Sequence, residues 1–174
     1  MQKAPTPANE SERIAAVKEL HLLDTLPEER FDRITRLALF IFNVPISTIT
    51  LVDSNREWYK SCQGLEDREA DRAISFCGHA ITQEGVLEIP NALEDERFKD
   101  NPMVISPPNI RYYIGKPLKS TKGFNVGTFC LKDTKPRQKL GSDFFAAFLA
   151  LAAWAETEIR YHELFIALKP ASLL

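Results

Sequence analysis

The feature that most constrains the fold is a long stretch without periodicity, Asn91–Asn109, between two segments that read as β-strands. The apolar segment Val86–Ile89 precedes it, and the aromatic segment Arg111–Leu118 follows it. Compact domains seldom keep about twenty residues without regular structure unless those residues bind or cover something. We therefore expect this stretch, here called the lid, to fold over one face of a sheet.

Helical and strand patterns follow one another along the rest of the chain. Helices are predicted over residues 10–23, 26–43, 75–83 and 142–168. Strands are predicted over residues 46–52, 57–62, 86–89, 111–118 and 125–131, the last two joined as a hairpin. This order indicates an α+β fold, in which helices cover the faces of a central antiparallel sheet of five to six strands.

Local signals refine the helix boundaries. Thr25 and Glu28 have the spacing of a capping box, with Pro27 tolerated in the first turn. Ser75 stands where its side chain can cap the next helix. One further turn of helix is expected inside the lid, near Glu94–Arg97.

Composition and charge exclude several classes of protein. Basic and acidic residues number 22 and 24, and no basic stripe suggests a nucleic-acid partner. The apolar segment Phe144–Trp154 is too short to cross a bilayer, and the N-terminus has no signal-peptide core. The three cysteines, at 62, 77 and 130, are odd in number, which favours free thiols in a reducing compartment. We therefore expect a cytoplasmic protein without a membrane span.

Five short motifs in a fixed order resemble a known family. They read Ser75-Phe76-Cys77-Gly78-His79-Ala80-Ile81, Leu87-Glu88-Ile89-Pro90-Asn91-Ala92, Arg97-Phe98-Lys99-Asp100-Asn101-Pro102, Arg111-Tyr112-Tyr113-Ile114-Gly115-Lys116-Pro117-Leu118 and Gly127-Thr128-Phe129-Cys130-Leu131-Lys132-Asp133. From about Leu20 to Glu158, the chain resembles the GAF domain, a small-molecule sensory domain of bacterial signalling proteins. The resemblance implies a GAF/PAS-like sheet with long N- and C-terminal helices. It divides the chain into a disordered tail (1–9), a GAF domain (10–158) and a C-terminal extension of a signalling helix (159–174).

The lid and the helix before it supply the residue types of a ligand pocket. Apolar walls are expected from Phe76, Phe98, Met103, Val104, Ile105 and Tyr113, and hydrogen bonds from Ser75, Asn101, Asn109, Arg111 and Thr128. In the family, ligands lie under this loop and near the start of that helix. The resemblance therefore implies a set of ligand-binding residues: Ser75, Phe76, Cys77, Asp95, Arg97, Phe98, Asn101, Val104, Asn109, Arg111, Tyr113 and Thr128.

Two features favour an anionic or polar group on the ligand. The backbone N–H groups of Ser75–Gly78 open a helix, and Arg97 or Arg111 could hold a phosphate or carboxylate with two hydrogen bonds. Other roles stay open for these side chains. Arg111 pairs with Glu88 or Asp133 in one alternative, and Phe98 fixes the lid to the core in another.

The family contains several ligand classes. Cyclic nucleotides such as cAMP or cGMP are candidates, although residues 85–111 lack the Asn-Lys…Phe…Asp-Glu signature of the members that bind them. Cys77-Gly78-His79 suggests a bilin, but the attachment pair of the family lies later, where this chain has Asn109-Ile110-Arg111. We therefore expect neither a bilin nor haem. No metal is expected, because the cysteines and histidines lack ligand spacing.

The C-terminal helix suggests how a signal leaves the domain. Positions 148, 152, 155, 159, 162 and 166 alternate spacings of four and three, as a coiled-coil seam does. We expect a homodimer through the terminal helices, a domain that is not itself catalytic, and a covalently linked effector such as a diguanylate cyclase or histidine kinase. The alternatives are a GAF fold used only for dimerisation and a free methionine sulfoxide reductase that uses the cysteines.

Overall fold

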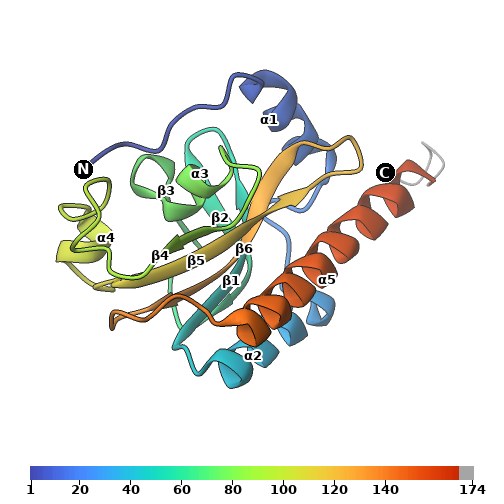
Figure 1. The fold of residues 1–174 in the computed structure, drawn as a ribbon. Helices are drawn as coiled ribbons and strands as arrows, with labels where there is room; N and C mark the ends of the chain where they lie inside the picture. Colours follow the sequence, from blue (N-terminus) through green and yellow to red (C-terminus); the bar gives the residue numbers. More distant parts are fainter. Residues whose placement is uncertain (169–174) are drawn as a thin grey trace.

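Residues 1–168, the part of the chain that this computed structural model describes, build an antiparallel sheet of six strands (Figure 1). The strands are β1 (Ile46–Val52), β2 (Arg56–Gln63), β3 (Glu69–Asp71), β4 (Leu87–Ile89), β5 (Tyr112–Lys119) and β6 (Asn125–Asp133). Their order across the sheet is β3-β2-β1-β6-β5-β4. The α+β class predicted from the sequence is confirmed. The short edge strand β3 was not predicted, because its three residues lie in a charged segment without apolar alternation.

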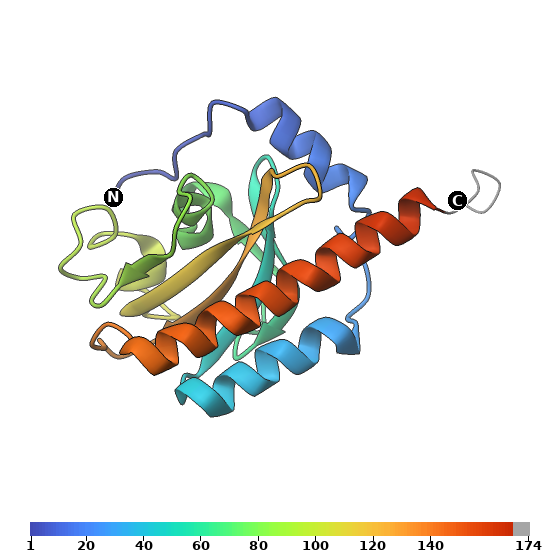
Figure 2. The same cartoon turned by 45° about the vertical axis from the view of Figure 1, so that its right-hand side comes forward.

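Helices cover both faces of this sheet. They are α1 (Glu10–Glu19), α2 (Glu29–Phe42), the 3₁₀ turn η1 (Arg72–Ile74), α3 (Phe76–Ala80), α4 (Pro102–Ile105) and α5 (Ser142–Ala167). The long helices α2 and α5 lie side by side on one face, here called the helical face, while α3 and the lid cover the other, here called the lid face (Figures 1 and 2). Among the helices of residues 1–168, none combines the length and apolar character that a membrane span requires.

The core of the helical face consists of apolar side chains. Phe31, Ile34 and Ala38 on α2 recur at helical spacing and are buried against the sheet. The Phe148 ring on α5 lies 5.3 Å from that of Phe129 on β6, centroid to centroid. Burial of these side chains fixes both long helices on the sheet.

On the lid face, aromatic rings fill the space between the lid and the sheet. The ring of Phe76 on α3 is parallel to that of Phe98 in the lid, with centroids 4.2 Å apart. The Phe76 ring also stacks on that of Tyr113 of β5, with centroids 5.1 Å apart. All three side chains are buried. Phe98 therefore fixes the lid to the core, as one of the two sequence-based alternatives proposed.

Several predicted helix boundaries differ from the structure. The capping box is absent: the Thr25 hydroxyl donates to the Leu22 carbonyl, and Glu28 pairs with Lys60, which projects from a bulge in β2. The lid helix is α4, not 94–97, because Asn101 caps it through the Met103 N–H, and Pro102 suits its first turn. Ser75 does cap α3, accepting from Gly78 N–H, but α3 ends at Ala80 rather than at residue 83.

The two ends of the chain were expected to lie outside the domain proper. Residues 1–9 contain no helix or strand and run along the lid side, where Ala4 N–H donates to the Ala73 carbonyl at 3.1 Å (Figure 2). At the other end, α5 continues to Ala167, close to the predicted residue 168. The predicted extension 159–174 falls partly outside the described residues, and the domain boundaries stay predictions.

Candidate functional site

The centre of the lid face carries polar side chains that are fully enclosed. Successive residues of a strand point to opposite faces, so Thr128 and Lys132 of β6 face α3 while Phe129 and Leu131 face α5. Neighbouring strands and α3 add further members. We call the set the buried polar cluster: Thr48, Thr50, Glu57, Tyr59, Ser75, Cys77, Thr128, Cys130 and Lys132, each almost without exposed surface.

Glu57 organises one half of this cluster. Its carboxylate accepts hydrogen bonds from the Tyr59 hydroxyl at 2.7 Å and from the Ser75 hydroxyl. The Lys132 ammonium lies 3.8 Å from Glu57 Oε1 and 5.3 Å from the centroid of the Tyr59 ring. Burial lowers the pKa of Lys132, but its interactions with Tyr59, Glu57 and the two cysteines outweigh burial and raise it, so the side chain is a cation.

Two members of the cluster lack hydrogen-bond partners. The Lys132 ammonium is beyond hydrogen-bonding distance of Glu57, and no side chain or backbone group within residues 1–168 accepts from it. The Thr128 hydroxyl is likewise without a partner in this part of the chain. Nearly all buried polar groups in proteins have a partner, and an exception calls for an explanation. Such costly groups are typical of functional sites rather than of a stabilising core.

A pocket of about 540 Å³ opens beside this cluster, between the lid and the segment that follows β2. We call it the edge pocket. Its lining residues are Tyr59, Gly64, Leu65, Glu66, Asp67, Glu69, Ala70, Asp71, Ile74, Met103, Pro107 and Pro108. Apolar side chains of the lid, η1 and the 64–66 turn form one part, and four carboxylates form the other. Tyr59 belongs to both the pocket and the buried polar cluster, so the two are adjacent.

The predicted ligand-binding residues do not line the edge pocket, although Met103, predicted as an apolar wall, does. Ser75, Cys77 and Thr128 belong to the buried polar cluster, and Phe76, Phe98 and Tyr113 fill the space under the lid. The remaining members hold the lid together, as described next. Their role as ligand contacts stays a prediction.

The polar residues of the lid bond mainly to the lid itself and to η1. Arg97 forms a two-bond pair with Asp95, at 2.9 and 2.6 Å. Arg111 donates to the backbone carbonyl of Val104 at 2.7 Å, so it pairs with neither of the carboxylates proposed from the sequence. Asn101 donates to the Ile74 carbonyl at 2.8 Å, which joins α4 to η1. The arginines are therefore committed to fixing the lid backbone.

Four parts of the pocket lining are not predicted from the sequence: Tyr59, Leu65, Ile74 and the Pro107-Pro108 pair. The pattern around Tyr59 predicts a strand but not a site. The consecutive prolines in the lid were the available signal, since such a pair is rigid and ends regular structure. The rest depends on how β3 and the lid meet in space, for which the sequence carries no local pattern.

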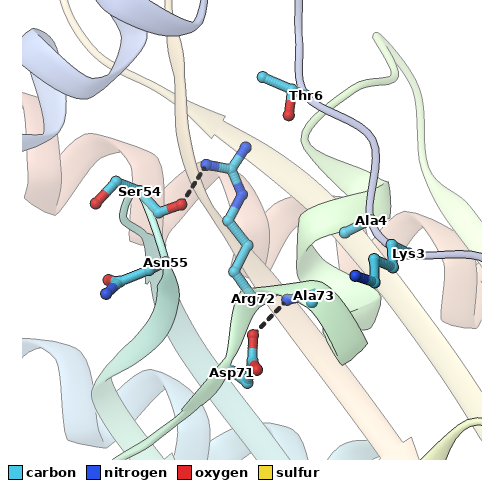
Figure 3. A pocket seen from close by; sticks show the side chains of 8 residues that line it. All are labelled: Lys3, Ala4, Thr6, Ser54, Asn55, Asp71, Arg72 and Ala73. Atoms are coloured by element: carbon cyan, nitrogen blue, oxygen red, sulfur yellow. Dashed lines mark hydrogen bonds between the residues drawn. The ribbon is translucent and has the colours of Figure 1, made fainter.

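A second hollow, of about 280 Å³, lies between the N-terminal segment and the β1–β2 turn (Figure 3). Figure 3 shows Arg72 at its centre, between Thr6 on one side and Ser54 on the other. Its guanidinium donates to the carbonyls of Asp53 at 3.0 Å and Ser54 at 3.3 Å, and to the Glu10 carboxylate. These contacts tie η1 to α1 and to the β1–β2 turn.

Glu10 pairs with Arg72 at the second hollow, so the charged groups there hold the fold together. Burial raises the pKa of its carboxyl, but hydrogen bonds and charge from Arg13 and Arg72 outweigh burial and lower it to about 2. Elsewhere in residues 1–168, no three His, Cys, Asp or Glu side chains converge as a metal site requires. The edge pocket with the adjacent buried polar cluster is therefore the candidate functional site.

The sequence and the fold are both similar to those of known proteins. The chain is 40% identical over 140 residues to a cyclic di-GMP phosphodiesterase of Pseudomonas aeruginosa, covering 80% of this chain but only 24% of that protein. A GAF domain of an Acinetobacter phosphoenolpyruvate-protein phosphotransferase superposes with a TM-score of 0.61 at 15% identity, covering 90% of this chain and 97% of that one. The blue-light absorbing form of the Thermosynechococcus elongatus PixJ GAF domain gives 0.63 at 12% identity, covering 97% of each.

A family model supplies the remaining evidence. The model of the GAF domain matches residues 26–159, from just before α2 to the second half of α5. The match includes all six strands, the lid, the edge pocket and the buried polar cluster. This chain belongs to the GAF domain family.

Proposed function

We propose that this chain is a regulatory sensory module that binds a small molecule in the edge pocket and transmits binding through α2 and α5 to an effector. The observation that carries the proposal is the edge pocket itself, which adjoins unpartnered polar groups in the middle of the lid face. Its volume lies within the usual range of ligand pockets, about 300–1,000 Å³. We propose that the module is not itself catalytic.

The charge of the pocket selects a class of ligand. Glu66, Asp67, Glu69 and Asp71 contribute carboxylates, of which Glu69 is paired with Arg56, and none of the described lining residues is basic. A phosphate placed among carboxylates would be repelled, and Arg97 and Arg111 are already bonded within the lid. We therefore propose a neutral or cationic ligand with an apolar part that contacts Met103 and Pro107. A cyclic nucleotide is the competing ligand.

A bulge in β2 connects the pocket to the helical face. Tyr59 lines the pocket, and the next residue, Lys60, donates from the opposite face to the Leu26 carbonyl at 2.8 Å and pairs with Glu28 at 2.6 Å. The Ser61 hydroxyl bonds to Asp32 of α2 at 2.5 Å. A ligand that moves Tyr59 would thus bias the position of α2, which is a shift between pre-existing arrangements.

From α2 the connection reaches α5. Arg30 of α2 contacts His162 Nδ1 of α5 at 2.9 Å, and the Phe42 and Phe148 rings lie 6.3 Å apart. Outward-facing Phe40, Tyr161 and Leu164 leave apolar surface exposed along this helix pair. We propose that a second copy covers this surface in a homodimer, because apolar patches of this kind commonly mark interfaces.

The effector belongs to this proposal as well. Because the chain spans only 24% of the length of the cyclic di-GMP phosphodiesterase that it resembles, the activity of that protein does not transfer directly. We propose an effector that acts on cyclic di-GMP in the cytoplasm, by hydrolysis as the name of the relative states. A diguanylate cyclase or histidine kinase is the alternative proposed from the sequence.

A pair of variants on α4 tests the binding site. Met103 lines the pocket and Ile105, on the same short helix, is exposed and does not. In a thermal-shift screen of amines, amino acids, cAMP and cGMP, we expect a neutral or cationic compound to stabilise the chain by about 2.7 kcal/mol at 100 times its Kd. Met103→Arg should abolish the shift, and Ile105→Arg should retain it.

Other outcomes would overturn the assignment. A shift that survives Met103→Arg would place the ligand elsewhere. Stabilisation by cAMP or cGMP and by no amine would replace the proposed ligand class. If no compound in such a screen binds, and the chain dimerises at micromolar concentration in its absence, the fold serves dimerisation alone.

A further inference from the structure

Two thiols meet inside the buried polar cluster. Cys77 on α3 and Cys130 on β6 place their sulfur atoms 3.8 Å apart, and both side chains are fully buried. They are 53 positions apart in the sequence, so the fold alone brings them together. The third cysteine, Cys62, is partly exposed and bonds to the Leu65 carbonyl instead.

The surroundings of the pair shift the pKa values of the two thiols in opposite directions. The Thr48 hydroxyl lies 3.0 Å from Cys130 Sγ, and Lys132 follows Cys130 by two positions on the same face of β6. Burial raises the pKa of the Cys130 thiol, but hydrogen bonds from Cys77 and Thr48 and the Lys132 charge outweigh burial and lower it to about 7. Burial raises the pKa of Cys77, so this thiol keeps its proton and donates it to Cys130.

We propose that Cys77 and Cys130 form a reversible disulfide when a hydroperoxide reaches the lid face, which gives the domain a redox-responsive site separate from its ligand pocket. The Lys132 ammonium, which has no hydrogen-bond acceptor in the described chain, then has a role beside its charge interaction with Glu57, since it is the cation that stabilises a thiolate on Cys130. The Tyr113 hydroxyl, 3.6 Å from Cys77 Sγ, holds the second sulfur in place.

The chemistry needs only hydrogen peroxide as oxidant. The Cys130 thiolate attacks one oxygen, the O–O bond breaks, and hydroxide leaves and takes up the proton that the thiol had lost, which gives a sulfenic acid and water. Cys77 sulfur then attacks Cys130 sulfur, so an S–S bond forms as the S–O bond breaks, and hydroxide leaves with the Cys77 proton as a second water. The two thiols lose two electrons and two protons, and the peroxide gains them to become two waters.

Burial of both thiols favours a small oxidant. Neither sulfur has exposed surface, so a large disulfide such as oxidised glutathione cannot contact them in the folded chain. The ring centroid of Tyr59, which lines the edge pocket, lies 5.3 Å from the Lys132 ammonium, so the pocket is the part of the surface nearest to this cluster that the structure identifies.

Differential alkylation of the reduced full chain tests this proposal. After treatment with hydrogen peroxide, the protein is denatured in acid, labelled with N-ethylmaleimide and digested. We expect Cys77 and Cys130 to lose labelling together, a peptide that links them to appear, and Cys62 to stay labelled. Dithiothreitol should restore both sites, and oxidised glutathione should leave them labelled.

Variants separate the two roles, with Cys62→Ser as the matched control that should leave the linked peptide unchanged. In Cys77→Ser, oxidation should stop at a sulfenic acid on Cys130, trapped by dimedone.

The wild-type chain in urea supplies a measurement that no folding defect can obscure. In urea, peroxide should no longer oxidise Cys77 and Cys130 in preference to Cys62. Continued labelling of Cys77 and Cys130 while peroxide oxidises Cys62, or a linked peptide that contains Cys62, would overturn the proposal.

Discussion

The two faces of the sheet are built on opposite principles. On the helical face, Phe31, Phe129 and Phe148 form an apolar core between the sheet and two long helices, and the buried Lys60 and Ser61 beside it are paired with Glu28 and Asp32. The lid face is equally well enclosed, yet it buries a carboxylate, an ammonium and several hydroxyls in its middle. Burying apolar surface stabilises a fold, while burying polar groups costs free energy unless all are paired.

The difference supports the proposal that the functional site lies on the lid face. Both faces belong to the same six strands, and alternation along β6 sends Phe129 one way and Lys132 the other. The helical face therefore holds the fold together, and the lid face gives up stability for a polar site. Substitutions that treat the two faces in the same way should thus have unlike effects.

The largest effect is expected in the helical core. Phe148→Ala removes a ring that contacts those of Phe42 and Phe129, and the cavity should lower the free energy of unfolding by about 3–5 kcal/mol. Phe144 on the same helix is 52% exposed, so Phe144→Ala should cost less than about 1 kcal/mol. Urea unfolding followed by circular dichroism gives both numbers. Equal losses would contradict the assignment of this face as the stabilising core.

The next effect sharpens the contrast on the lid face. Lys132→Met leaves the Glu57 carboxylate buried without its counter-charge and should cost about 3 kcal/mol. The double variant Glu57→Gln/Lys132→Met removes both charges and should recover most of that loss. A double-mutant cycle in urea measures the coupling. Additive losses would show that the two charges do not sense each other at 3.8 Å.

A smaller effect distinguishes partnered from unpartnered hydroxyls on the same face. The Thr50 hydroxyl bonds to that of Thr48 at 2.9 Å, so Thr50→Val should cost about 1 kcal/mol. Thr128 lies directly opposite Thr50 in the sheet, and its hydroxyl has no partner within the described chain. Thr128→Val should accordingly be neutral or stabilising by up to about 1 kcal/mol. A loss in Thr128→Val as large as in Thr50→Val would mean that the Thr128 hydroxyl is bonded in solution.

The fold was predictable to a large degree because periodicity reports burial. The spacing of Phe31, Ile34 and Ala38 gave α2, and the alternation in Ile46–Val52 gave β1. The edge strand β3 was harder to predict, because it contains only Glu69, Ala70 and Asp71 and is defined by its pairing with β2. The lid helix was predicted at 94–97, whereas it begins at Pro102, where the Asn101 side chain caps it and proline suits the first turn.

The candidate site was predictable only in part. Placement of Ser75, Cys77 and Thr128 near one another followed from the family resemblance, and the structure brings them into one cluster. Lys132 was missed because a lysine that alternates with apolar residues is normally read as facing solvent. Tyr59 was missed because its role arises from the meeting of β2 with the lid. Neither arrangement leaves a local pattern in the sequence.

The smallest expected effect is a change in stability with pH. Each face carries one histidine, buried at His79 on the lid face and half-buried at His162 on the helical face. His79 bonds to the Gln2 carbonyl at 3.2 Å on the lid side, and His162 contacts Arg30 on the helical side. Burial, the largest cause, lowers the pKa of both rings below 6.5. The unfolded chain therefore binds these protons first, so the contribution of the two rings to stability is full above about pH 6.5 and falls as the pH drops below it. This loss adds to the one expected as the Cys130 thiolate takes up its proton near pH 7.

Single variants divide this loss between the faces. His79→Gln should flatten the part of the profile that comes from the lid face, and His162→Gln the part that comes from the α2–α5 contact. Urea midpoints measured from about pH 7.5 to about 5.5 avoid most carboxylate titration. If the wild type gains stability on acidification in that range, the two rings are more basic when folded, and the environments described here for them are wrong. If only His162→Gln flattens the profile, the N-terminal segment leaves His79 in solution, and the lid face is more open than the helical face.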